Sequence, residues 1–211
     1  MDHIIVTIAR QYGSGGKTVG QMFAQKNQIP CYGRDILRRA SDESGINEAL
    51  FGQVDEKLRS GLLSGISKKI YRIGDLIAPS SSEFTSPQNL FNYQAKVIRD
   101  LADQGPCVFI GRCADFVLKD RKNVVSVFVH APEDYCLEQA REHTPESVGD
   151  MSKYIAKKDK YRGDFYRYYT GNEWNDARNY DLCLNSSRLG FDGCVRAIEK
   201  YIEVRFGEQN W

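Results

Sequence analysis

Residues 11–18, Gln-Tyr-Gly-Ser-Gly-Gly-Lys-Thr, have the composition of a loop that surrounds phosphate groups. Glycines let backbone N–H groups turn toward one centre and donate to phosphate oxygens, and a following helix adds the positive end of its dipole. The segment Gly16-Lys17-Thr18 matches the end of the pattern G-x-x-x-x-G-K-[ST], although Gln11 stands where that pattern begins with glycine. These residues predict that the protein binds a nucleoside triphosphate.

The residue types of this loop suggest a division of roles. The predicted cofactor-binding residues are Gly13, Ser14, Gly15, Gly16, Lys17 and Thr18. We expect Lys17 to supply a point charge to the β- and γ-phosphates, and the Thr18 hydroxyl to ligate Mg²⁺. ATP and Mg²⁺ are therefore the predicted cofactors. A plain glycine-rich turn between a strand and a helix is the alternative.

The elements around this loop are those of a parallel α/β protein. Residues 3–9 form a nearly continuous β-branched apolar run, which is typical of a strand buried on both faces of a sheet. Further strands are predicted at 29–32, 107–112, 124–129 and 180–184. Helices are predicted at 16–27, 35–60 with breaks near Gly45 and Gly52, 87–104, 133–142, 147–168 and 191–206. This alternation predicts a three-layer P-loop fold with a central parallel sheet of about five strands.

Several polar residues follow the ends of the predicted strands. In a parallel sheet, ligands bind beyond the carboxyl ends of the strands. Gly13, Arg112 and His130 each follow such an end, so we expect residues far apart in the sequence to meet in one cleft. Residues 60–88, which are rich in glycine and serine, are the least regular stretch.

Composition limits the classes of partner. The chain has 211 residues, a formal net charge of +1 and 41% hydrophobic residues, as expected for one soluble globular domain. A nearly neutral chain lacks the general attraction to nucleic acids and membranes, so neither is expected as a partner. No stretch has the length of a membrane span and no signal peptide is evident, which predicts a cytoplasmic protein that acts on a small molecule. The sequence leaves the oligomeric state open.

Four segments give the chain a resemblance to the cytidylate kinase-like family, a branch related to bacterial cytidylate kinases. They are Ile-Ala-Arg-Gln-Tyr-Gly-Ser-Gly-Gly-Lys (8–17), Cys-Val-Phe-Ile-Gly-Arg-Cys-Ala-Asp-Phe-Val-Leu (107–118), Phe-Val-His-Ala-Pro-Glu (128–133) and Tyr-Asp-Leu-Cys-Leu-Asn (180–185). The resemblance covers nearly the whole chain. It implies one nucleoside monophosphate kinase-like domain over 1–211, with an acceptor-binding insertion around 34–100 and a helical lid around 147–170. The implied reaction transfers the γ-phosphoryl group of ATP to a small acceptor, first of all CMP or dCMP.

The resemblance also implies which residues bind the acceptor. Arg112 follows the third strand and is similar to an arginine that meets the monophosphate and the base in cytidylate kinases. Cys113 stands where those kinases carry Asp, and Asp115 is the candidate substitute. Arg39, with its neighbour Arg38, best matches a further acceptor-binding arginine. A salt bridge at the strand end and a solvated helix face are the respective alternatives.

Basic and aromatic residues crowd the segment where the resemblance places the lid. Lys158 and Arg162 are four residues apart and share one helical face. Together with Lys17 and Arg112, they form the predicted catalytic set, because basic residues over the phosphates stabilise the transferring charge. The same composition suits RNA binding, or a solvated helix whose tyrosines pack underneath.

Three positions depart from the family pattern. His130 ends the fourth strand, where cytidylate kinases often carry Asp, and Gln11 and Cys113 are the other two. These departures favour a second hypothesis, a nucleotide-binding regulatory protein without kinase turnover.

Overall fold

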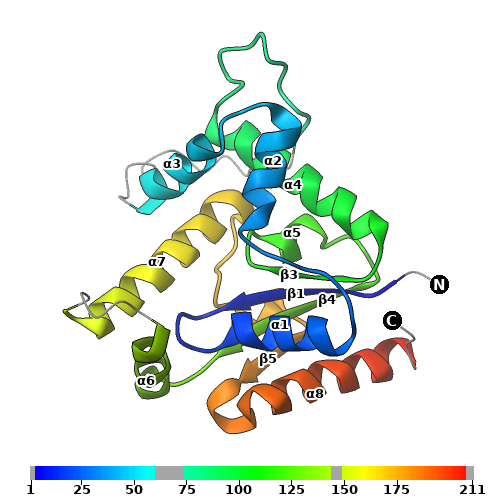
Figure 1. Cartoon of the computed structure of the whole chain (residues 1–211), viewed down its shortest axis with the longest axis vertical. Coiled ribbons are helices and arrows are strands. Elements are labelled where there is room, and N and C mark those ends of the chain that lie inside the picture. Colours follow the sequence, from blue (N-terminus) through cyan, green and yellow to red (C-terminus); the bar gives the residue numbers. More distant parts are fainter. Residues whose placement is uncertain (1–2, 60–73, 144–148, 208–211) are drawn as a thin grey trace.

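The computed structural model describes residues 3–59, 74–143 and 149–207. A central sheet of five parallel strands lies between two layers of helices (Figure 1). The strands are β1 (Ile5–Arg10), β2 (Cys31–Tyr32), β3 (Cys107–Ile110), β4 (Val124–His130) and β5 (Leu182–Asn185), in the order β2-β3-β1-β4-β5. The predicted three-layer P-loop fold with a parallel sheet is confirmed.

Helices cover both faces of this sheet. The α-helices of the described residues are α1 (Gly16–Lys26), α2 (Asp35–Ser44), α3 (Glu48–Arg59), α4 (Pro87–Gln104), α5 (Ala114–Val117), α6 (Glu133–His143), α7 (Met151–Thr170) and α8 (Ser186–Phe206). The helices α1 and α8 pack on one face, and α2, α4 and α5 pack on the other. Within the described ranges, no helix combines the length and the apolar character that a membrane span requires.

The side chains of β1 alternate between the two layers. Val6 and Ile8 are buried with residues of α1 and α8, whereas Ile5 is buried with residues of α2 and α4. Because both faces of the strand are covered, its sequence is a continuous apolar run instead of an alternating one. The sheet therefore fixes the direction in which β1 delivers the phosphate loop.

Local signals set several helix boundaries. The helix α4 begins at Pro87 because the Oγ of Ser86 accepts from the N–H of Asn89 at 3.3 Å, and proline suits the first position of a helix. Gly45 ends α2 with a φ of 70°, as the break predicted there required. The break predicted near Gly52 is wrong, because α3 continues through this residue. The short helix α5 was not predicted, since four residues show no helical periodicity.

The least regular stretch of the sequence is described only in part. Residues 60–73 lie outside the described residues, and residues 74–86 form neither a helix nor a strand. The helix predicted from 147 begins at Met151 in the structure, and residues 147 and 148 lie outside the described ranges.

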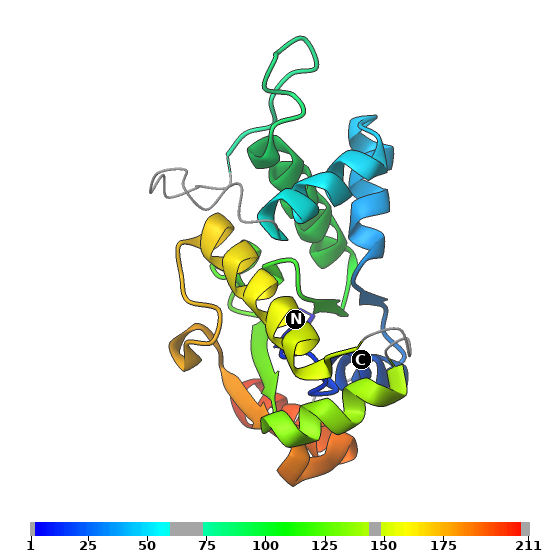
Figure 2. The same cartoon turned by 90° about the vertical axis from the view of Figure 1, so that its left-hand side faces the viewer.

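Aromatic residues anchor the C-terminal half of α7. Tyr169 is 1% exposed and stacks on Phe91 of α4, with ring centroids 4.1 Å apart. Phe165 packs edge-on against both rings. Some tyrosines of this helix therefore pack underneath it, as expected for a solvated helix with an aromatic inner face. Along its length α7 contacts both α3 and α6 (Figure 2).

Removing either of two neighbouring hydroxyl groups of the sheet should change the free energy of unfolding, in opposite directions. Thr7 of β1 is 2% exposed, and no described residue accepts or donates a hydrogen bond at its Oγ1. Ser126, its partner in register on β4, donates to Oδ2 of Asp181 at 3.0 Å. We expect Thr7→Val to raise the free energy of unfolding by about 1 kcal/mol, because it removes a buried hydroxyl without a partner. We expect Ser126→Ala to lower it by about 1 kcal/mol. Urea unfolding measures both, and a destabilised Thr7→Val variant would contradict this account.

Candidate functional site

The loop between β1 and α1 has the backbone of a phosphate cradle. Gly13 and Gly15 have φ angles of 79° and 74°, in the left-handed region that favours glycine. A Cβ on Gly13 would overlap with the backbone of Cys136 in α6, and one on Gly15 would overlap with the ring of Phe191 in α8. The loop is thus held between two helices in a conformation that side chains would disrupt.

The first turn of α1 presents backbone donors. The N–H of Val19 donates to the carbonyl of Gly15 at 2.9 Å. This is the first hydrogen bond of the α-helical pattern in α1. The N–H groups of Gly16, Lys17 and Thr18 precede it and are the donors that a helix leaves at its N-terminus. The first turn contains no acidic residue, and the Lys17 side chain is exposed. This end of α1 therefore offers positive potential to an anion.

The polar side chains of the loop bind the sheet. Ser14 is buried, and its Oγ donates to the carbonyl of Val129 at 3.0 Å. Its own carbonyl accepts from the Oγ of Ser186 at 2.7 Å. Gln11 donates its N–H to Val129 at 3.1 Å, and its Oε1 accepts from the N–H of Ala131 at 3.2 Å. Ser14 thus offers a phosphate its backbone, and Gln11 extends the pairing of β1 with β4.

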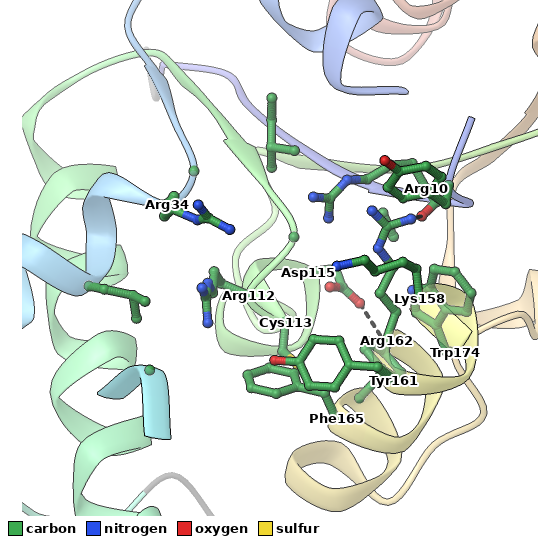
Figure 3. Close-up of a pocket in the computed structure, with 18 of the residues that line it drawn as sticks. Arg10, Arg34, Arg112, Cys113, Asp115, Lys158, Tyr161, Arg162, Phe165 and Trp174 are labelled. Atoms are coloured by element: carbon green, nitrogen blue, oxygen red, sulfur yellow. Dashed lines mark hydrogen bonds between the residues drawn. The ribbon is translucent and has the colours of Figure 1, made fainter. Parts of the chain in front are cut away.

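A cavity of about 720 Å³ opens beside the loop, beyond the carboxyl ends of β1 and β3 (Figure 3). Its walls come from the end of β1, the turn between β2 and α2, α3, the turn after β3, and α7. Five cationic side chains line it: Arg10, Arg34, Arg112, Lys158 and Arg162. The acidic residues among its described lining are Glu48 and Asp115. The excess of positive charge suits an anionic ligand.

The turn after β3 holds Arg112 in a strained backbone conformation. Gly111, Arg112 and Cys113 have φ angles of 74°, 61° and 54°, which the two non-glycine residues rarely adopt. Cys113 is buried at the start of α5. The guanidinium of Arg112 lies over the ring of Phe165, 5.9 Å from its centre. The turn therefore directs Arg112 into the cavity.

Asp115 faces the same cavity from the first turn of α5 (Figure 3). The hydroxyl of Tyr166 donates to its Oδ2 at 2.6 Å. Burial raises the pKa of Asp115 to about 6, although the hydrogen bond from Tyr166 acts in the opposite direction. Burial and the charge of Asp115 also raise the pKa of Tyr166. Asp115 thus supplies a partly buried carboxylate where the sequence placed a substitute for the Asp missing at position 113.

The helix α7 contacts the phosphate loop directly. Oδ1 of Asp159 accepts from the N–H of Tyr12 at 2.8 Å and from Nη1 of Arg162 at 2.9 Å. The same Nη1 donates to the carbonyl of Arg10 at 3.0 Å, and the guanidinium lies 5.4 Å from the centre of the Tyr12 ring. Burial raises the pKa of Asp159 and lowers that of Arg162. Lys158 lies over the ring of Tyr154 at 4.9 Å and lines the cavity.

The structure brings part of the predicted site together. Arg112, Asp115, Lys158 and Arg162 all line the cavity, and the loop residues 13–18 adjoin it through Tyr12. Arg38 and Arg39 are exposed and are not among the described residues that line it. Arg39 pairs with Asp35 at 3.5 Å. Their role in binding an acceptor stays a prediction.

Four residues of this region were not assigned from the sequence. Arg10 ends β1 and Arg34 precedes α2, and both line the cavity. Asp159 joins α7 to the loop, and Trp174 completes the wall. The position of Arg10 at the carboxyl end of a strand is the signal that also identified Arg112. Asp159 lies among lysines and resembles a surface residue in the sequence.

The sheet has five parallel strands, a glycine-rich loop follows its central strand, and a cationic cavity lies beside that loop. This arrangement is typical of P-loop kinases. The profile of the cytidylate kinase-like family matches residues 5–188. The chain therefore belongs to the cytidylate kinase-like family.

Solved structures share this fold over nearly their full length. A crystal structure of an uncharacterized protein from Eubacterium ventriosum is 25% identical, with a TM-score of 0.65, and the match covers 95% of this chain and 98% of that one. A shikimate kinase from Bacteroides thetaiotaomicron is 13% identical, with a TM-score of 0.53 and coverage of 95% and 98%. A shikimate kinase from Acinetobacter baumannii in complex with shikimate is 12% identical, with a TM-score of 0.50 and coverage of 98% and 96%. The two shikimate kinases show the fold alone. A search of curated proteins found no match.

The raised pKa of Asp115 makes the stability of the protein depend on pH. An unfolded Asp has a pKa near 3.9, so above about pH 6 the folded state carries a carboxylate that burial disfavours. Below about pH 4 both states are protonated and this penalty disappears. We expect Asp115→Asn to raise the free energy of unfolding at pH 7, by on the order of 2 kcal/mol, and to change it little at about pH 4.

Urea unfolding across this range measures the effect. Asp120→Asn, at an exposed position of the same region, is the control and should show no such trend. An Asp115→Asn effect of equal size at both ends of the range would contradict the raised pKa.

Proposed function

We propose that the protein is an ATP-dependent phosphotransferase that moves the γ-phosphoryl group to a small acceptor, a nucleoside monophosphate such as CMP or dCMP. The cavity carries the proposal, because it places five cationic side chains beside the phosphate loop. A phosphate dianion carries more negative charge and more acceptor oxygens than a single carboxylate, such as that of shikimate, so it is the better match to this excess of positive charge. Membership of the cytidylate kinase-like family supports this choice.

The loop supplies what the triphosphate of ATP needs. The N–H groups of the first turn of α1 and the ammonium of Lys17 bind phosphate oxygens, and the left-handed glycines let the chain wrap around them. The hydroxyl of Thr18 is the protein ligand that would hold Mg²⁺, whose charge would stabilise the triphosphate. When bound, Mg²⁺-ATP supplies the phosphoryl group to be transferred.

The rest of the site positions the acceptor and excludes water. Phosphoryl transfer depends on positioning and charge stabilisation, so no side-chain nucleophile is needed. Arg34 and Arg112 approach the cavity from one side, and Lys158 and Arg162 approach it from α7 on the other (Figure 3). In this proposal the first pair holds the phosphate of the acceptor and the second stabilises the transferring group. We propose α7 as the lid and α2 with α3 as the acceptor-binding wall of one cytoplasmic kinase domain.

The release of ADP from Mg²⁺-ATP tests the proposal. It is screened across nucleoside monophosphates, with shikimate as an acceptor that has no phosphate. We expect release with a nucleoside monophosphate, CMP or dCMP first, and none with shikimate. Tight ATP binding without release to any acceptor would instead support a nucleotide-binding regulatory protein.

Lys17→Met separates folding from turnover. The exposed ammonium lies at the positive end of α1, so its removal should leave the circular dichroism spectrum unchanged. Turnover should fall by about a hundredfold or more, as is typical for the loss of one preorganised charge. Lys26→Met, in the last turn of α1 and paired with Glu199 at 2.8 Å, is the matched control. Transfer near the wild-type rate in Lys17→Met would contradict the proposed role.

Variants of Arg34, which precedes α2, and of Arg39, which lies within α2, show which of the two arginines binds the phosphate of the acceptor. Arg34 lines the cavity, whereas Arg39 pairs with Asp35. We expect Arg34→Met to raise the KM for the acceptor roughly tenfold or more, because it removes charge-assisted hydrogen bonds, and to leave the KM for ATP unchanged. Arg39→Met should leave both values close to wild type. The opposite result in steady-state kinetics would favour the assignment to Arg39 that the family resemblance implies.

A further inference from the structure

The side chain of Arg10 runs from the phosphate loop to the turn after β3. A Cβ on Gly16 would overlap with the Cβ of Arg10, and a Cβ on Gly111 would overlap with its Nη1. The absence of a side chain at these two glycines, one in each turn, leaves the space that Arg10 fills. Its guanidinium therefore reaches the cavity between the loop and Arg112 (Figure 3).

The charged groups closest to this guanidinium are mostly cations. Burial and the charges of Arg162 and Arg112 lower the pKa of Arg10 to about 9, so the group remains charged at neutral pH at a cost. Asp159 acts on Arg10 in the opposite direction, but its Oδ1 is bonded to Arg162 at 2.9 Å. Among the described residues, Arg10 forms no ion pair within 4.0 Å.

This environment argues against a structural role for Arg10. An arginine that stabilises a fold has a carboxylate or carbonyl partner, because a desolvated charge without one lowers stability. Three guanidinium groups from β1, the turn after β3 and α7 meet here instead. A ligand with several anionic oxygens relieves this repulsion and accepts hydrogen bonds from the guanidinium of Arg10.

We propose that Arg10 binds the phosphoryl group as it passes from ATP to the acceptor. The inference rests on the proposed function and adds to it a charge from β1. In the reaction, the bond from the γ-phosphorus to the β–γ bridging oxygen breaks and leaves its electron pair on ADP. A bond from an acceptor phosphate oxygen to the same phosphorus forms. A dianionic acceptor phosphate has no proton to lose, and Arg10 keeps its own proton while it donates hydrogen bonds to the transferring oxygens.

Binding of inorganic phosphate tests the site without turnover. Thermal midpoints are measured with increasing phosphate for the wild type, for Arg10→Met and for Arg178→Met, an exposed arginine paired with Asp176 outside the cavity. Phosphate should raise the midpoint of the wild type and of Arg178→Met. The apparent Kd for phosphate should rise roughly tenfold or more in Arg10→Met, whose midpoint without phosphate should be no lower than that of the wild type. A phosphate response of Arg10→Met equal to that of the wild type would overturn the proposal.

A second pair of variants tests the proposal while Arg10 keeps its charge, and this pair is decisive if Arg10→Met does not fold. Gly111→Ala displaces the guanidinium, whereas Gly45→Ala imposes similar left-handed strain at a φ of 70°, where a Cβ meets open space. We expect Gly111→Ala to lose the phosphate response and Gly45→Ala to keep it. If both variants respond as the wild type does, the proposal is wrong.

Turnover separates this proposal from the proposed function. With the acceptor found by the screen, Arg10→Met should lower kcat by about a hundredfold and change the KM for ATP less than tenfold. An unchanged kcat would refute the role of Arg10 and leave the kinase assignment intact. A wild type that transfers to no acceptor would refute the kinase assignment, while the phosphate response would still decide whether Arg10 binds an anion.

Discussion

Repulsion among the cations of one cavity is the constraint on which the site depends. Arg10, Arg112 and Arg162 approach one another from three different elements, and the nearby Asp159 is already bonded to Arg162. Such an arrangement persists only where the surrounding structure fixes each element. The stack of Tyr169 on Phe91 holds α7, and the buried Cys113 holds the strained turn after β3. The apolar core thus keeps together the charges that, in the proposed function, an anionic ligand neutralises.

The residues that depart from the family pattern have structural partners here. Gln11 continues the pairing of β1 with β4, and Cys113 is buried at the start of α5. The ring of His130 stacks near Phe128, with centroids 6.4 Å apart, and its carbonyl accepts from Ser186. Packing accounts for these three positions, while Asp115 brings a carboxylate to the cavity from the next turn.

The sequence predicted the sheet well because both of its faces are covered. The continuous apolar run of β1 predicts a buried strand, and Ser86 followed by Pro87 predicts the start of a helix. Both signals lie within a few neighbouring residues. Residues that line the cavity were predicted where they closely follow a strand, as Arg112 does. They were missed where tertiary packing determines the direction of the side chain. Arg10 turns toward the cavity only because Gly16 and Gly111 leave room for it, and Gly52 fits inside α3 because nothing there requires a break.

Phosphorus NMR of the reaction tests whether the cationic cavity accepts a phosphate as the group to be phosphorylated. The protein is incubated with Mg²⁺-ATP and a mixture of nucleoside monophosphates, and the spectrum separates phosphomonoesters, diphosphates and inorganic phosphate. We expect one monophosphate resonance to fall while the two coupled resonances of its diphosphate and those of ADP appear together. Formation of ADP with inorganic phosphate alone, or an unchanged spectrum from folded protein that binds ATP, would contradict it.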